Sequence, residues 1–212
     1  MTRGGNPHLA FEPVMAGVGL EQARAAAVLV HGRDQDAEVM LDVVQRLGLD
    51  DVAYVLPVAA QRSWYPGRYF DPIEVNQPHV DWALEAYAAA VACATEAGVP
   101  DSRIVLAGFS QGACLIAELI ARNPRPFAGA AVLTGSLLGP DGAMTEPAFL
   151  DGLPMYFGAS RHDEWVAIER AQLTARMCER AGARTSIEIY EDRVHHINDR
   201  AVSGLAKLLA AV

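Results

Sequence analysis

The chain has 212 residues, of which 51% are hydrophobic and 20% charged, and its 26 acidic and 17 basic residues give a formal net charge of −9. This size and composition predict one globular domain with a full core over residues 1–212, and they exclude long disordered tails. The negative charge argues against nucleic acid or an anionic membrane surface as the main partner. No segment is long and apolar enough to predict stable insertion into a membrane.

The amino-terminal segment lacks the apolar stretch of a secretory signal, so we expect a cytoplasmic protein. The three cysteines, Cys93, Cys114 and Cys178, are far apart in the sequence. They lack the spacing of a disulfide framework or a zinc site. The sequence therefore predicts no metal and no cofactor.

Residues 1–24 are weakly patterned and predict no more than an edge hairpin, made by residues 9–13 and 14–18. From residue 25 onward, apolar runs of strand length alternate with helical patterns. The predicted strands cover residues 25–30, 51–56, 103–107, 129–134, 155–158 and 185–190. The helical patterns cover residues 39–47, 80–91, 111–123, 165–178 and 202–212. Asp36 is expected to cap the first helix, and Gly48 to end it.

This alternation predicts a single-domain α/β fold with a mostly parallel, doubly wound sheet and helices on both faces. In such a sheet the active site lies at the carboxyl ends of the strands. Residues 58–78 interrupt the alternation, because they show no period and are rich in aromatic side chains and turn formers. A loop of this length in a compact domain is commonly functional or disordered, and its aromatic content argues against disorder.

Ser110 lies at the centre of a G-x-S-x-G pattern, Gly108-Phe109-Ser110-Gln111-Gly112, between a predicted strand and a predicted helix. The pattern alone is equally compatible with an ordinary turn in a chain rich in glycine and alanine. The strand before it and the helix after it favour a nucleophile elbow, in which a strained turn exposes the serine at the top of the sheet. Ser110 is therefore the candidate nucleophile.

A serine hydroxyl needs a neighbouring base to take its proton. In this architecture the base follows the acid and the serine along the chain. Only His195 and His196 come after the last predicted strand. We choose His195 as the base, with His196 as the rival; the alternative role for either is that of a helix cap or a surface residue.

The acid that orients the histidine is expected in the loop after the strand at 155–158, where Asp163 is well placed. Asp163 is also a good cap for a helix that begins at residue 164 or 165, and both roles are compatible. Glu164 and Asp192 are weaker alternatives. The developing oxyanion needs preorganised donors, for which the backbone amides of Gln111 and Arg33 are the candidates.

Several motifs together resemble the phospholipase/carboxylesterase branch of the α/β-hydrolases, to which acyl-protein thioesterases also belong. They are HGRDQDAE after the first predicted strand, SWYP in the long loop, GFSQGA at the elbow, the Asp163 loop and HHIN before the last helix. The resemblance implies a triad of Ser110, Asp163 and His195, with oxyanion amides at Arg33 and Gln111. Asp34 stands where the family commonly has glycine, which leaves the geometry and the charge of the oxyanion loop open at this point.

The resemblance also suggests residues that bind substrate. Trp64, Tyr65 and Tyr69 resemble the loop that flanks the acyl pocket of the family, although pinning the long loop to the body is an equal alternative. Leu137 and Leu138 are expected to line the same pocket.

We therefore expect a serine carboxylesterase that hydrolyses short- to medium-chain esters through an acyl-enzyme on Ser110. Lysophospholipid or protein-thioester hydrolysis is the first alternative, and a lactone or a peptide is a further possible substrate because one triad serves all of these bonds. A non-catalytic binding protein with the same fold is the alternative from a different class. The family resemblance also suggests a homodimer.

Overall fold

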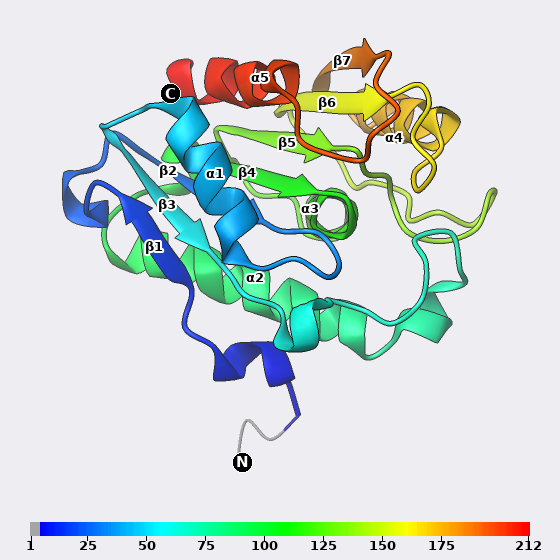
Figure 1. Cartoon of the computed structure of the whole chain (residues 1–212), viewed down its shortest axis with the longest axis horizontal. Coiled ribbons are helices and arrows are strands. Elements are labelled where there is room, and N and C mark those ends of the chain that lie inside the picture. The colour runs from blue at the N-terminus through cyan, green and yellow to red at the C-terminus, as the bar shows by residue number, and fades with distance from the viewer. Residues whose placement is uncertain (1–4) are drawn as a thin grey trace.

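The computed structural model describes residues 5–212, and within them seven strands form one sheet in the order β1-β3-β2-β4-β5-β6-β7 (Figure 1). The strands are β1 (Val14–Gly17), β2 (Ala25–Val30), β3 (Val52–Leu56), β4 (Ile104–Phe109), β5 (Gly129–Leu133), β6 (Pro154–Ser160) and β7 (Arg184–Tyr190). All neighbours pair in parallel except β1, which is antiparallel to β3. The predicted, mostly parallel sheet is confirmed.

Helices cover both faces of the sheet, as a doubly wound fold requires. They are α1 (Ala37–Leu47), α2 (His79–Glu96), α3 (Gln111–Arg122), α4 (Ile168–Arg180) and α5 (Asp199–Ala210). One core packs against α2, α3 and α4, and the other packs against α1 and α5. Along β2, Val28 and Val30 point into the first core and Leu29 into the second, because successive strand residues face opposite sides.

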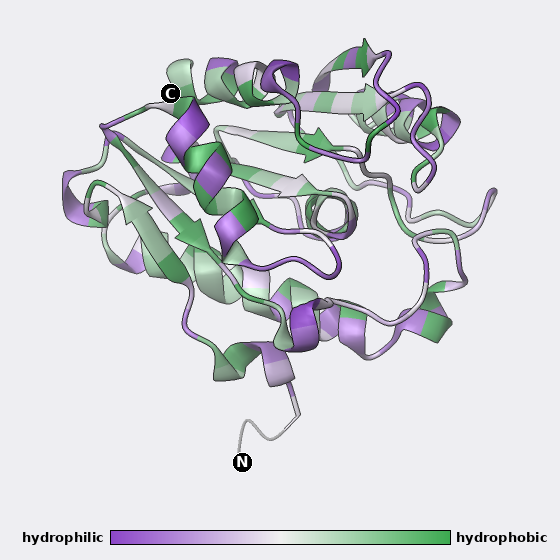
Figure 2. Ribbon diagram, viewed as in Figure 1, coloured by the Kyte–Doolittle hydropathy of each residue, from purple (hydrophilic) through white to green (hydrophobic). Residues whose placement is uncertain are grey.

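Both cores need apolar strands between them, and Figure 2 shows hydrophobic residues concentrated on the strands, with hydrophilic residues on the helices and loops. Asp36 caps α1 by accepting a hydrogen bond from the Glu38 amide, and Gly48 ends that helix in the left-handed conformation, as predicted. Within the described residues, no helix has the length and apolar character needed to span a bilayer.

Two local predictions are wrong. Residues 9–13 do not form a hairpin with residues 14–18: a short 3-10 helix, Pro7–Ala10, precedes β1, and β1 pairs with β3 instead. The Asn6 side chain caps this short helix, and Pro7 has the fixed φ that a helical first turn needs. The fourth helix begins at Ile168 rather than at residue 165, because the preceding residues turn around the Asp163 carboxylate.

Candidate active site

The turn at Ser110 joins β4 directly to α3. The backbone of Ser110 has φ 53° and ψ −117°, a conformation that residues other than glycine rarely adopt. Glycine is required on both sides for lack of space. A Cβ on Gly108 would lie 2.5 Å from the carbonyl carbon of Gly112, and a Cβ on Gly112 would lie 2.6 Å from the carbonyl oxygen of His31. The two glycines therefore let strand and helix approach closely enough to expose the serine.

A continuous chain of hydrogen bonds connects three side chains that follow the ends of β4, β6 and β7. The Ser110 Oγ lies 2.8 Å from His195 Nε2, and His195 Nδ1 lies 2.6 Å from Asp163 Oδ2. With a proton on Nδ1, the imidazole donates to the carboxylate and presents Nε2 as the acceptor for the serine hydroxyl. The geometry is that of a nucleophile, a base and an orienting acid.

Neighbouring residues bury Asp163 and His195 and hold their side chains in place. The side chain of Asp163 is 1% exposed and that of His195 is 18% exposed, while the ring of Phe109 lies 4.8 Å from the imidazole. Burial by itself raises the pKa of Asp163. Hydrogen bonds from His195 and from the amides of Val166 and Trp165 outweigh it, so that this pKa lies below its usual range. Asp163 is thus held as a carboxylate beside His195.

The capping role predicted for Asp163 is wrong. Asp163 accepts from the amides of Trp165 and Val166 in the turn before α4. That helix begins at Ile168, and its N-cap residue is Ala167.

The alternative candidates for the base and the acid take no part in the hydrogen bonds between Ser110, His195 and Asp163. His196 is exposed, and its ring contacts the carbonyl of Val194. The Asp192 carboxylate accepts a hydrogen bond from Asn198, and Glu164 is exposed.

Arg33 and Gln111, whose amides are the oxyanion candidates, both line the cavity beside Ser110. In residues 5–212, neither N–H has a hydrogen-bond acceptor, whereas the neighbouring Gly32 amide donates to the Gln35 side chain at 2.8 Å. Asp34 adopts the left-handed conformation, with φ 59°, and its N–H donates to the carbonyl of Arg62 at 2.7 Å. Aspartate tolerates this conformation, so Asp34 takes the backbone shape for which glycine is the usual residue.

His31 has a structural position. It is fully buried, its Nε2 accepts from the Ala59 amide and its Nδ1 donates to the Gly32 carbonyl. Burial lowers the pKa of His31, which favours the neutral ring that these two bonds require.

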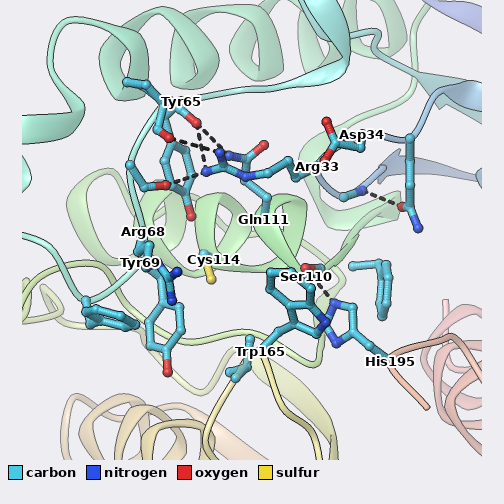
Figure 3. Close-up of a pocket in the computed structure, with 17 residues that line it drawn as sticks. Arg33, Asp34, Tyr65, Arg68, Tyr69, Ser110, Gln111, Cys114, Trp165 and His195 are labelled. Atoms are coloured by element: carbon cyan, nitrogen blue, oxygen red, sulfur yellow. Dashed lines mark hydrogen bonds between the residues drawn. The ribbon is translucent and has the colours of Figure 1, made fainter.

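A cavity of about 450 Å³ opens in front of Ser110. Tyr65 and Tyr69, from the long loop, form part of its wall, and His195 and Trp165 lie at another side (Figure 3). The sequence also leads us to expect Trp64, Leu137 and Leu138 in this wall.

The structure places these three residues in the core instead. Trp64 is fully buried, its Nε1 donates to the His31 carbonyl, and its ring packs edge-on against Tyr87 at 4.8 Å. Leu137 and Leu138 are also buried, and neither belongs to the cavity wall. For Trp64 the alternative holds: an aromatic residue of the long loop pins that loop to the body of the protein.

The sequence patterns do not predict some of the residues that line the cavity. Trp165 fits the apolar spacing of a helix, but it precedes α4 and is 66% exposed beside His195. Arg68 and Phe70 lie in the aperiodic loop, where no pattern indicates orientation. The arginine next to the aromatic SWYP stretch is the one signal that the sequence offers for a charged group in the wall.

The long loop is held by side chains that lie far from it in the sequence. Arg33 donates to the carbonyls of Tyr65, Pro66 and Gly67, and the Gln111 side chain bridges the Trp64 amide and the Tyr65 carbonyl. Residues 5–212 contain no group of three or more His, Cys, Asp and Glu side chains arranged to hold a metal ion.

A mostly parallel sheet, helices on both faces and a serine in a strained turn after a central strand define the α/β-hydrolase fold. The chain belongs to the phospholipase/carboxylesterase family, because the model of that family matches residues 18–212.

Solved structures agree with this assignment. The chain is 31% identical to a phospholipase/carboxylesterase from Dyadobacter fermentans, with a TM-score of 0.87 over 94% of this chain and 96% of that one. A carboxylesterase from Mesorhizobium loti has 21% identity and a TM-score of 0.71 over 89% of both chains. SOBER1 from Arabidopsis thaliana has 18% identity and a TM-score of 0.74 over 89% of this chain and 98% of that one. The last two show likeness of fold alone.

Proposed function

We propose that this protein is a cofactor-independent serine esterase that hydrolyses short- to medium-chain carboxylic esters through an acyl-enzyme on Ser110. The observation that carries the proposal is the unbroken hydrogen-bonded chain from Ser110 through His195 to Asp163. Membership of a hydrolase family supports it.

In the first half of the reaction, Ser110 Oγ attacks the ester carbonyl while His195 Nε2 takes the hydroxyl proton. The amides of Arg33 and Gln111 donate to the oxyanion of the tetrahedral intermediate. His195 then gives the proton to the leaving alcohol, and an acyl ester on Ser110 is left. Asp163 stabilises the imidazolium that forms in between.

In the second half, water loses a proton to His195 and attacks the carbonyl of the acyl-enzyme. The bond between the acyl carbon and Ser110 Oγ then breaks, His195 returns the proton to Oγ, and the acid is released. The cavity of about 450 Å³ falls in the lower part of the range for small-ligand sites, which favours small and medium acyl groups over long ones.

The test is hydrolysis of p-nitrophenyl esters from acetate to palmitate by the wild-type protein and by Ser110→Ala, together with labelling by a fluorophosphonate. We expect turnover and labelling in the wild type, neither in Ser110→Ala, and an optimum below the longest chains. The absence of both turnover and labelling in the wild type would favour the non-catalytic binding protein. A thioester and a lysophospholipid in the same panel separate the remaining alternatives.

A further inference from the structure

The charges in the cavity wall are opposite in sign to the protein as a whole. The chain has a net charge of −9, yet the charged side chains that line the cavity are Arg33, Arg68 and Asp34, two cations and one anion. Among residues 5–212, Arg33 donates only to backbone carbonyls, and these uncharged partners do not neutralise its charge. A cavity with low-dielectric walls and an excess of one sign attracts ligands of the other sign.

Arg68 is the cation that is free to bind. Within the described part of the chain, its guanidinium makes no hydrogen bond and no ion pair. The guanidinium lies over the ring of Phe70, with Cζ 5.7 Å from the ring centroid. An arginine presents a planar fork of donors that matches a carboxylate. The side chain therefore offers its donors to a ligand in the cavity.

The backbone that carries Arg68 is firmly held. Asn76, which is fully buried, accepts a hydrogen bond from the Gly67 amide at 2.7 Å and donates to the Arg68 carbonyl at 3.0 Å. The Arg68 amide donates to Asp71 at 2.6 Å, and the next carbonyl, that of Tyr69, accepts from the Gly139 amide at 2.8 Å. These bonds fix the point from which the flexible side chain extends, and such preorganisation is what a binding site needs.

The position of Arg68 indicates which part of a substrate it meets. Figure 3 shows Arg68 and Tyr69 on the opposite side of Ser110 from His195. The leaving alcohol must lie beside His195, because this residue protonates it. The wall with Arg68 and Tyr69 is consequently open to the acyl part.

We propose that the cavity selects esters whose acyl chain ends in a carboxylate, that is, monoesters of dicarboxylic acids, and that Arg68 binds this carboxylate. The inference rests on the proposed esterase function and adds its substrate class. Asp34 in the same cavity opposes a doubly charged phosphate more strongly than a singly charged carboxylate.

The experiment compares monomethyl esters of succinate, glutarate, adipate and pimelate with the methyl esters of the corresponding monoamides, which match them in size but are neutral. For each chain length the ratio of kcat/KM, charged over neutral, is measured in the wild type and in Arg68→Gln. We expect Arg68→Gln to lower this ratio about tenfold at the best chain length, the usual effect of losing a charge-assisted hydrogen bond.

Arg176→Gln is the matched control, because it removes one positive charge, as Arg68→Gln does. Arg176 is exposed on α4 and lies outside the cavity. It should keep the wild-type ratio. Arg68→Lys should retain part of the preference, and Arg68→Glu should lower the ratio below that of Arg68→Gln. These two variants also replace Arg68→Gln if it does not fold.

If both proteins hydrolyse the esters and the ratio of kcat/KM, charged over neutral, is the same in the wild type and in Arg68→Gln, the inference is overturned. The esterase proposal would still stand. Failure to hydrolyse any ester, with no fluorophosphonate labelling, would overturn both. An equal fall of the ratio in Arg176→Gln would show that net charge, and not Arg68, is responsible. A series of terminal phosphonates that is hydrolysed faster than the carboxylates would overturn the assignment of the carboxylate.

Discussion

The two sides of the cavity are built in different ways. Ser110, Asp163 and His195 each follow the carboxyl end of a parallel strand, so the sheet itself brings them together. The opposite side is the loop of residues 57–78, which is held by side-chain hydrogen bonds from Arg33, Gln111 and other distant residues to its backbone. The first side depends on the register of neighbouring strands, whereas the second depends on a few polar contacts and on the buried ring of Trp64.

The largest expected effect tests the strand-end side. His195→Gln should lower kcat/KM about 10⁴-fold or more, since it removes the base for Ser110. His196→Gln is its matched control and should stay near the wild-type value, because His196 is exposed and its ring lies against the Val194 carbonyl, away from Ser110 and Asp163. Steady-state kinetics with one p-nitrophenyl ester measures both. An inactive His196→Gln beside an active His195→Gln would reverse the assignment.

The next effect tests how closely β2, β4 and α3 must approach. Gly112→Ala should lower the free energy of unfolding by about 3 kcal/mol, because its Cβ would press against backbone atoms of Val30 and His31 that cannot move aside. Gly19→Ala, where no atom lies within 4 Å of the added Cβ, is the control and should change stability little. Urea unfolding followed by circular dichroism measures both; equal midpoints for the two variants would contradict the steric account.

This difference between the two sides also explains what the sequence could predict. The sheet, its helices and the elbow follow from apolar period and glycine spacing, which are local signals. The positions of Ser110, Asp163 and His195 follow because strand order then decides which loops meet. The match to the phospholipase/carboxylesterase family agrees with the resemblance found in the motifs.

The loop side could not be predicted in the same way. Trp64 lies in the core although its neighbour Tyr65 lines the cavity, and no local pattern separates the two. Their orientation depends on Gln111 and Arg33, about 30 to 50 residues away in the sequence. The expected homodimer and the cytoplasmic location stay predictions, because contacts within one chain do not report on either.

A smaller effect tests the loop side. Asn76→Ala removes the two hydrogen bonds from this buried side chain to the Gly67 amide and the Arg68 carbonyl, and it leaves a gap where the fully buried side chain was. We expect a loss of about 1–3 kcal/mol in the free energy of unfolding, together with a higher KM. Labelling of Ser110 by a small fluorophosphonate should change less than KM does, since the triad belongs to the other side.

The control for this variant is Asn123→Ala, because Asn123 is exposed and follows the end of α3. A fall in labelling as large as the change in KM would mean that the two sides of the cavity are coupled more closely than their separate construction implies.

The smallest expected effect concerns pH and the hydrogen bonds of Asp163. These bonds lower its pKa below the ordinary value of 3.8, so the ionised carboxylate stabilises the folded protein. This contribution is complete above the pKa of the unfolded carboxyl and is lost as the pH falls through the lower, folded value. The difference in free energy of unfolding between wild type and Asp163→Asn should therefore shrink as the pH falls from about 5 to below about 4, where the Asp163 carboxylate takes up its proton.

Urea midpoints of both proteins between neutral pH and about pH 2.5 measure this difference. The chain has 26 acidic residues, many of which titrate in the same range, so the wild-type curve alone would not isolate Asp163. Subtracting the variant cancels the carboxylates that the two proteins share. A difference that stays constant to the lowest pH would mean that the hydrogen bonds from His195 and the two amides do not favour the charged form, and the strand-end side would then lack the electrostatic support that distinguishes it from the loop side.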